Sequence, residues 1–300
     1  MNCTRKHTLV TGASSGIGRA TALRLAAAGQ HVYAGVRREA DGAQLVRDAT
    51  GGEITPVRLD VTQASQIAAA AAIIGGHAAG LDGLVNNAGY GLACPTELVP
   101  LDSFRRQLDV NVTGQLAVTQ AMLPLLRRAA GRIVIVSTIG VRFNPPFAGP
   151  LDAAKAALTA LADSLRQELA PWDIRVVLVE PASINSGAAG KVSRDAAAAM
   201  AAASPQGRAL YQATFTSMLA VMNQREGHGS PPAAAAAATI TRALTVSRPR
   251  TMYLTGKDSR RLALLSLLPT PVLDAAKRRV FGLPAPGSLV PAGRVSPATR

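Results

Sequence analysis

The chain of 300 residues has few cysteines, few aromatic residues and no long hydrophobic run. Its only cysteines, Cys3 and Cys94, cannot build a disulfide framework or a multi-cysteine metal site, and we expect unpaired thiols in a reducing compartment. The four histidines have no ligand-like spacing, so we predict no metal. No run approaches the roughly 18 apolar residues of a membrane span, and no signal peptide precedes the first apolar segment. We therefore expect a soluble protein of the cytoplasm.

Acidic residues are also scarce, because 18 of them stand against 32 lysines and arginines, which gives a net charge of +14. Basic proteins often bind nucleic acids, since their cations release counterions from a phosphate backbone. Here the basic residues are scattered, aromatic residues make up 3% of the chain, and no RNA- or DNA-reading motif is present. We predict no nucleic-acid partner. A basic rim that attracts an anionic cofactor or an acyl-CoA-like substrate accounts for the charge equally well.

Short β-branched runs alternate with segments of helical period, which is the pattern of repeated βαβ units around a parallel sheet. The expected strands cover His7–Thr11, Gln30–Val36, Thr55–Asp60, Leu81–Asn86, Arg132–Ser137, Ile174–Glu180 and Thr251–Leu254. The expected helices cover Gly16–Ala28, Glu39–Ala49, Ala64–Ala79, Asp102–Arg128, Asp152–Ala170 and Pro232–Val246. Apolar strands of this kind need helices on both faces, so we predict a single α/β domain over 1–300 with a doubly wound, seven-stranded parallel sheet.

Three segments fall outside this alternation. Residues 183–229 form an Ala-rich stretch that is too long for a simple connection, and we expect a helical lid over a substrate cleft. Residues 257–282 predict a C-terminal helical extension with short helices at Leu262–Leu268 and Val272–Val280. Residues 283–300 are rich in Pro and Gly and predict a flexible tail.

A glycine-rich turn, Thr11-Gly12-Ala13-Ser14-Ser15-Gly16-Ile17-Gly18, lies directly between the first expected strand and the first expected helix. Glycines permit a tight turn and let the backbone approach a pyrophosphate, whose charge then lies at the positive N-terminus of the helix. A glycine-rich turn alone is weak evidence, but the flanking strand and helix supply the required context. The turn therefore predicts a dinucleotide site.

Further motifs follow in a fixed order: Leu59-Asp60-Val61, Asn86-Asn87-Ala88-Gly89, Asn111 and Pro181-Ala182. With Thr11–Gly18 they resemble the short-chain dehydrogenase/reductase family over roughly residues 7–256, and its hydroxysteroid and retinol dehydrogenase branch in particular. The resemblance implies a Rossmann fold and an NAD(P)-dependent oxidoreductase. It also implies cofactor contacts from Gly12, Ser14, Ser15, Gly16, Ile17, Gly18, Asp60, Val61, Asn87, Ala88, Gly89, Lys155, Pro181, Ala182, Ile184 and Ser186.

The charge at the end of the second expected strand favours NADP(H) over NAD(H). An acidic residue at this place would bind the ribose hydroxyls of NAD and repel a 2′-phosphate. The strand ends instead in Arg37 and Arg38 with no carboxylate, and arginine forms bidentate pairs with phosphate. Arg37 has the better spacing from Gly18, although both arginines could simply be solvated in a loop.

The family's catalytic pattern is a serine, then a tyrosine thirteen residues later, then a lysine four residues after the tyrosine. In this chain Lys155 matches the lysine, Thr138 occupies the serine position, and Leu151 occupies the tyrosine position. The resemblance implies catalytic roles for Asn111, Thr138 and Lys155, and Lys155 can also bind the nicotinamide ribose. Leu151 has no proton to give, and the loss of a positioned general acid typically costs about 10² to 10⁴ in rate.

Other groups could supply the proton. A water held by Lys155 and Asn111 is one candidate, and Tyr90 is another, although packing is its more ordinary role. Asp152 is a third, nominal candidate, but we expect it to cap the helix or face solvent, because it lies one helical position from Leu151.

Two functions therefore stay open. The first is an NADP(H)-dependent oxidoreductase that acts on a bulky apolar alcohol or ketone with reduced or altered activity. The second is a catalytically silent NADP(H)-binding sensor or partner subunit. In either case the resemblance implies a homodimer or homotetramer through the helices Asp102–Arg128 and Asp152–Ala170. The Leu/Arg helices of the C-terminal extension pack on the domain or touch a membrane surface as a peripheral contact.

Overall fold

A parallel sheet of seven strands forms the centre of the computed structural model, which describes residues 5–227 and 231–289. The strands are β1 (His7–Thr11), β2 (His31–Val36), β3 (Glu53–Arg58), β4 (Gly83–Asn86), β5 (Arg132–Val136), β6 (Arg175–Pro181) and β7 (Met252–Thr255). Their order across the sheet is β3-β2-β1-β4-β5-β6-β7. The predicted α/β fold with seven parallel strands is confirmed. The strand order reverses between β1 and β4, because β2 and β3 lie on one side of β1 and β4 to β7 lie on the other. Ligands of open α/β sheets bind at the carboxyl ends of the strands beside such a reversal.

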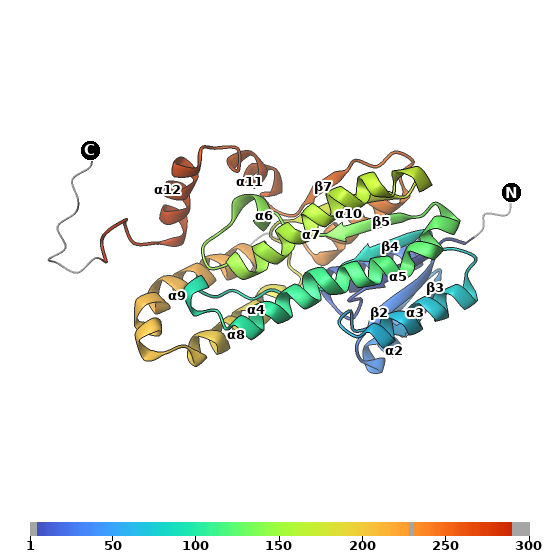
Figure 1. Ribbon diagram of the computed structural model, residues 1–300, viewed down its shortest axis with the longest axis horizontal. Coiled ribbons are helices and arrows are strands. Elements are labelled where there is room, and N and C mark those ends of the chain that lie inside the picture. The colour runs from blue at the N-terminus through green and yellow to red at the C-terminus, as the bar shows by residue number, and fades with distance from the viewer. Residues whose placement is uncertain (1–4, 228–230, 290–300) are drawn as a thin grey trace.

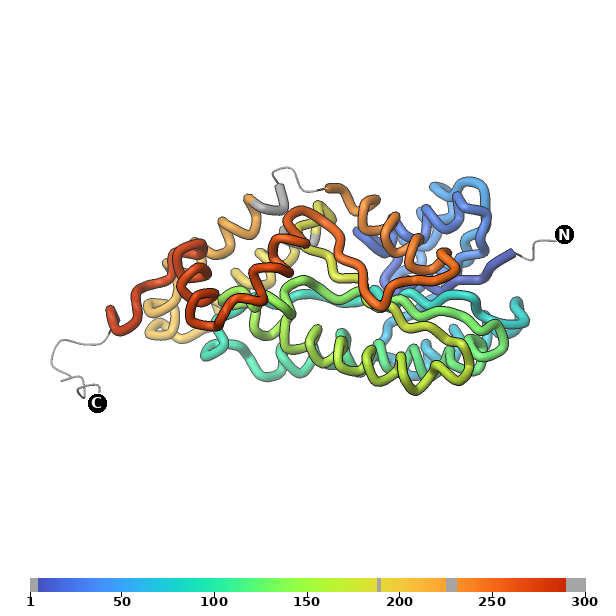
Figure 2. The backbone as a smooth tube through the Cα atoms, turned by 90° about the horizontal axis from the view of Figure 1, so that it is seen from above, coloured from blue at the N-terminus to red at the C-terminus, as the bar shows by residue number. Residues whose placement is uncertain are grey.

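Helices cover both faces of the sheet, as Figure 2 shows from above. One face carries α1 (Gly16–Ala27), α2 (Glu39–Asp48) and α10 (Ala233–Thr245), with Val10, Val85 and Ile240 in the apolar layer beneath them. The other face carries α3 (Ala64–His77), α5 (Gly114–Ala129) and α7 (Gly149–Glu168). Because both faces are covered, β1, β2 and β4 are apolar and buried almost throughout.

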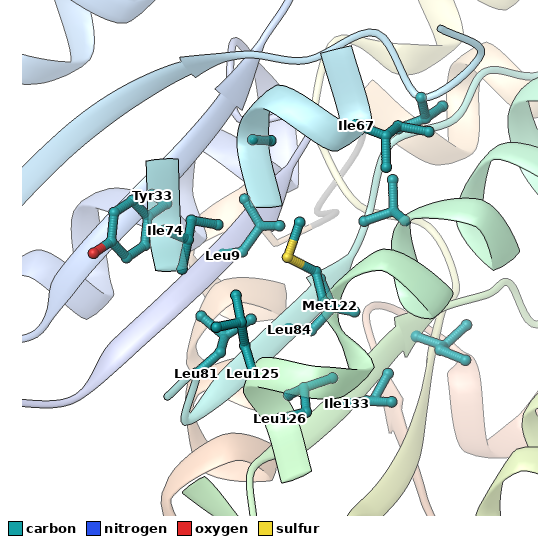
Figure 3. Close-up of a cluster of buried hydrophobic side chains, with 14 of the residues drawn as sticks. Leu9, Tyr33, Ile67, Ile74, Leu81, Leu84, Met122, Leu125, Leu126 and Ile133 are labelled. Atoms are coloured by element: carbon teal, nitrogen blue, oxygen red, sulfur yellow. The ribbon is translucent and has the colours of Figure 1, made fainter. Parts of the chain in front are cut away.

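The larger apolar layer lies between the sheet and the helices α3 and α5 (Figure 3). Leu9 and Leu84 come from β1 and β4, Ile74 from α3, and Met122 and Leu126 from α5, and none of these side chains is exposed. This layer holds the strand ends of β1 and β4 in a fixed relation, which positions the loops that follow them.

The segment predicted as one helix over Asp102–Arg128 is divided. It consists of α4 (Leu101–Leu108), a π-helical turn η2 (Asp109–Thr113) and α5. Asn111 lies in the wider turn and is fully buried. π-helical turns of this kind occur frequently at functional sites. Periodicity could not show this turn, because one extra residue shifts the pattern by less than the width of an apolar face.

The remaining elements extend beyond the sheet (Figure 1). Helices α8 (Ala188–Ala202) and α9 (Pro205–Gly227) occupy most of the predicted lid segment. Helices α11 (Ser259–Leu265) and α12 (Thr270–Phe281) form the C-terminal extension, and they begin three and two residues earlier than the sequence predicts. Short helices η1 (Thr96–Leu98), α6 (Gly140–Phe143) and η3 (Ala170–Trp172) complete the fold.

A third apolar cluster joins these outer helices to the domain. Phe215 and Met218 of α9, Leu273 and Phe281 of α12, and Phe143 of α6 are buried together. Residues 283–289 of the predicted tail contain no helix or strand, and residues 290–300 lie outside the described residues, as does Cys3. None of the helices in the described ranges combines the length and the apolar character that a membrane span requires.

Candidate active site

The ends of β1 and β4 are held together by a compact set of hydrogen bonds around Thr11. The Thr11 hydroxyl oxygen accepts the backbone N–H groups of Asn87 at 3.0 Å and Ala88 at 2.9 Å. The Asn87 side-chain amide donates to the carbonyl oxygens of Thr11 at 2.9 Å and Gly12 at 3.3 Å. The glycine-rich turn and the Asn-Ala-Gly segment, which are 75 residues apart in the sequence, therefore form one rigid edge.

Glycine is required at two places in this edge. Gly12 has φ of +65°, and a Cβ there would lie 2.9 Å from Ala88 Cα. Gly16 has φ of +54° and begins α1. Because α1 begins with a glycine, no side chain at Gly16 covers the backbone N–H groups at the start of the helix. No acidic residue lies in the first turn of α1. This arrangement suits an anion such as a pyrophosphate.

A cavity of about 510 Å³ opens over this edge. Twelve of the predicted cofactor residues line it: Gly12, Ser14, Ser15, Gly16, Ile17, Arg37, Asp60, Val61, Asn87, Ala88, Gly89 and Ser186. Gly18 lies behind the lining, where a Cβ would collide with the Gly12 carbonyl and the Asn87 amide. Arg38 does not line the cavity, and it is 80% exposed and pairs with Asp41 at 2.9 Å. Pro181, Ala182 and Ile184 do not line the cavity either.

Asp60 follows β3 at the rim of the cavity beside two arginines. Burial disfavours ionisation of Asp60, but hydrogen bonds from the backbone and side chain of Thr62 and the charges of Arg37 and Arg106 hold the pKa of its carboxyl below the ordinary value. The site therefore combines one ionised carboxylate with two guanidinium groups, and the excess positive charge can bind an anionic ligand.

The three predicted catalytic residues lie behind the cavity rather than in its lining. Asn111 is fixed by both polar atoms of its amide, since Oδ1 accepts the N–H of Tyr90 at 3.0 Å and Nδ2 donates to the Tyr90 carbonyl at 2.8 Å. Lys155 Nζ donates to the Val136 carbonyl at 2.7 Å. Burial lowers the pKa of Lys155 to about 8. A Cβ at Gly89 would lie 2.8 Å from Asn111 Oδ1 and 3.6 Å from Lys155 Nζ, so these two side chains lie directly behind Gly89, which lines the cavity.

Leu151 lies beside Gly91 of the cavity lining, and Thr138 follows the end of β5. Leu151 lies one turn before Lys155 on α7 and is partly exposed. Its Cδ2 atom and Val192 Cγ2 would both be 3.1 Å from a Cβ at Gly91, so Leu151 faces α8 across a narrow apolar gap. The Thr138 hydroxyl oxygen accepts the N–H of Gly140 at 3.1 Å.

These features match known proteins over most of the chain. Residues 6–197 match the family described as short chain dehydrogenase. The chain belongs to the short-chain dehydrogenase family. Human retinol dehydrogenase 16 is 34% identical over 287 residues, which cover 93% of this chain and 90% of that protein.

Solved structures of the short-chain dehydrogenase family have the same fold. A short chain dehydrogenase from Burkholderia cenocepacia in complex with NADP has a TM-score of 0.67 and 25% identity, and the match covers 92% of this chain and 99% of that one. A short chain dehydrogenase/reductase from Burkholderia phymatum in complex with NAD has a TM-score of 0.72 and 24% identity, with 91% and 92% covered. The second likeness supports the fold alone.

Several residues that line the cavity were not predicted from the sequence. Arg106 of α4 and Val110 of η2 line the cavity, as do Lys191, Val192 and Asp195 of α8. These residues come from helices whose sequences carry no recognisable motif, and only the folded arrangement brings them to the cofactor edge. Tyr90 also lines the cavity, and its hydroxyl donates to the Ser103 carbonyl at 3.4 Å.

The expectation that Asp152 caps α7 or faces solvent is wrong. Asp152 is 4% exposed, and its carboxyl lies against Gly140 of α6, where a Cβ would collide with it. Oδ2 is buried without a hydrogen-bond partner among the described residues. Burial raises the pKa of Asp152 to about 7. The prediction failed because α6, a helix of four residues, covers the side of α7 on which Asp152 lies.

Proposed function

We propose that this protein is an NADP(H)-dependent oxidoreductase acting on a bulky apolar alcohol or ketone, with an activity that is reduced or altered because a leucine occupies the family's tyrosine position. The observation that carries the proposal is the cavity of about 510 Å³ over the glycine-rich edge, with Arg37 in its wall. Its lining offers backbone N–H groups, glycines and cations, which suit the pyrophosphate and the phosphate of a dinucleotide.

The preference for NADP(H) is supported by the charges at the end of β2. Arg37 lines the cavity, the strand end carries no carboxylate, and Arg106 approaches from α4. Two guanidinium groups near one place favour a dianionic 2′-phosphate over a pair of neutral hydroxyls. The same arginines act on Asp60, so the pocket retains a carboxylate that can accept a hydrogen bond from the adenosine part.

The residues behind the cavity would position the reacting groups. Bound nicotinamide supplies or accepts a hydride. Lys155, whose ammonium donates to the Val136 carbonyl, would bind the adjoining ribose. The Thr138 hydroxyl, which accepts the Gly140 N–H, would orient a carbonyl. Leu151 cannot donate a proton, so the proton for a carbonyl must come from another donor. A water held by Lys155 and Asn111 is the donor that we propose.

An apolar substrate is supported by the surroundings of Leu151. The side chains of Leu151 and Val192 both lie beside Gly91 of the cavity lining. Val192 of α8 also packs against the apolar cluster that contains Phe215 and Met218 of α9. The similarity to retinol dehydrogenase 16, whose name gives a bulky apolar alcohol, points to the same substrate class. We further propose a homodimer or homotetramer formed through the exposed sides of α5 and α7.

A silent NADP(H)-binding sensor or partner subunit is the second candidate. One observation favours it: Leu151 occupies the family's tyrosine position, whereas Asn111 and Lys155 of the same family pattern are retained. The two candidates share the cofactor cavity and differ in turnover alone. Steady-state oxidation of NADPH against a panel of retinoid, steroid and long-chain ketones distinguishes them.

The cofactor proposal is tested by isothermal titration of NADPH and NADH into the purified protein. We expect tighter binding of NADPH. Arg37→Ala should weaken NADPH binding by about 10- to 100-fold, the effect of one charge-assisted phosphate contact, and leave NADH binding nearly unchanged. Arg38→Ala is the matched control, because Arg38 is adjacent in sequence but is not part of the cavity lining and pairs with Asp41. Equal binding of the two cofactors, or equal effects of the two substitutions, would contradict the proposal.

A further inference from the structure

The corner between α11 and α12 exposes several apolar side chains within an uncharged segment, which we call the apolar segment. Residues 262–273 contain no charged side chain. Within them Leu264, Leu267 and Val272 are 69%, 80% and 53% exposed, and Leu268 adds to the same surface. Single exposed leucines are ordinary on protein surfaces, but several within nine residues at one turn form a patch that a monomer in water rarely keeps.

These side chains are not needed to hold the extension on the domain. The opposite side of α12 does so through Leu273 and Phe281, which are buried against Phe143 and Phe215. Leu262 of α11 packs on the same cluster. The corner is therefore anchored from beneath, and the exposed leucines project from an already packed unit. In Figure 1 the connection between α11 and α12 lies at the margin of the molecule, away from the sheet.

Cations flank the apolar segment on both sides. Within residues 257–282 there are six basic residues and two acidic ones, a net charge of +4 (6 − 2). Arg260 and Arg261 stand directly before the segment, and Lys277, Arg278 and Arg279 follow it. Of these, Arg260, Arg261 and Arg279 are exposed. Lys277 is engaged with Asp274 at 3.3 Å.

We propose that the α11–α12 corner docks on an anionic lipid surface. The leucines would enter the boundary between headgroups and acyl chains, and the flanking arginines would meet the lipid phosphates, which is the arrangement of interfacial helices. The net charge of +14 adds attraction to the negative leaflet surface. The contact is peripheral, because no described helix could cross the bilayer.

A second copy of the chain fits the corner less well. A symmetric contact would place the patch of one molecule on the same patch of the other. The basic ends of α11 and α12 would then oppose each other, and like charges across an interface are unfavourable. A lipid surface has the opposite charge and can receive a convex, protruding corner.

Co-sedimentation of the full-length protein with vesicles tests the proposal. The vesicles contain phosphatidylcholine alone or with about 30 mol% phosphatidylglycerol. We expect binding to the anionic vesicles that weakens in high salt, and a partition coefficient that falls about tenfold or more in Leu264→Ser/Leu267→Ser. Arg260→Gln/Arg261→Gln should weaken binding to anionic vesicles in particular. Leu210→Ser is the matched control, since Leu210 is 59% exposed on α9, outside the corner, and its loss should leave binding unchanged.

Three results would overturn the proposal. The leucine double variant could bind as well as the parent protein, or Leu210→Ser could lose binding to the same extent, which would leave the corner without a special role. Sedimentation velocity could instead show a dimer that this double variant converts to monomer, with no lipid binding by the parent protein, which would make the corner an interface between copies. Cofactor affinity is measured without lipid, so these outcomes are independent of the proposed function.

Discussion

The buried carboxyl of Asp152 makes a specific prediction about stability and pH. Asp152 is 4% exposed, and its Oδ2 has no hydrogen-bond partner among the described residues. Burial raises the pKa of this carboxyl from 3.8 to about 7. We therefore choose Asp152→Asn as the perturbation, because the amide has the shape of the protonated acid and cannot ionise.

The sign follows from proton binding. Between about pH 4 and 7 the folded protein holds a proton on Asp152 that the unfolded chain has released, so the free energy of unfolding decreases as the pH rises through this range. A pKa difference of this size corresponds to roughly 4 kcal/mol, which is the full loss above pH 7. His31, whose pKa burial lowers, acts in the opposite direction below about pH 6.5, but it is present in both proteins and cancels in the comparison.

Urea unfolding at a series of pH values gives the difference between the two proteins. We expect Asp152→Asn to gain stability relative to the parent as the pH rises, from little difference near pH 4 to several kcal/mol above pH 7. A difference that stays constant between about pH 4 and 8 would refute the reasoning, because it would mean that the carboxyl has an ordinary pKa in the folded protein.

Two further predictions concern Gly18 of α1 and the ion pair of Arg142 with Glu180. Gly18→Ala should remove most NADPH affinity and lower the free energy of unfolding by about 1–3 kcal/mol, because the new methyl group meets the Gly12 carbonyl and the Asn87 amide. The control Gly76→Ala in α3, where an added Cβ has no neighbour within 4 Å, should raise the free energy of unfolding by about 0.5–1 kcal/mol in the same urea unfolding experiment. Equal effects of the two substitutions would contradict this account. Glu180 is fully buried and pairs with Arg142 at 2.5 Å, so Arg142→Ala should lower the free energy of unfolding in urea by about 2–3 kcal/mol. Adding Glu180→Ala removes the unpaired carboxylate and should recover part of this loss. No recovery in the double variant would show that the buried carboxylate does not cause the loss of stability.

The sheet and its main helices were predictable because their signals are local. Each buried strand is a short β-branched run, and each following helix has its own apolar period, so the boundaries agree within about two residues for most elements. β3 is displaced, since it covers Glu53–Arg58 and leaves Asp60 in the following loop. The exposed and charged residues of β3 blur the alternation that would have fixed its end.

The site was predictable only where it follows a strand end. The glycine-rich turn, Arg37 and the Asn-Ala-Gly segment could be placed because carboxyl ends of neighbouring parallel strands meet at one edge. Arg106 and Lys191 could not, because α4 and α8 reach the cavity through packing that no local pattern records. The environment of Asp152 depends in the same way on Gly140, whose missing side chain leaves room for the carboxyl.

We propose that the cofactor site binds NADP(H) fully and that Leu151 leaves it without the family's proton donor. The most direct test compares single-turnover oxidation of bound NADPH by an apolar ketone in the parent protein, in Leu151→Tyr and in Leu151→Phe. We predict equal NADPH affinity in all three, a rate about 10² to 10⁴ higher in Leu151→Tyr, and no gain in Leu151→Phe, which adds the ring without the hydroxyl. A parent protein that turns over as fast as Leu151→Tyr would contradict the account.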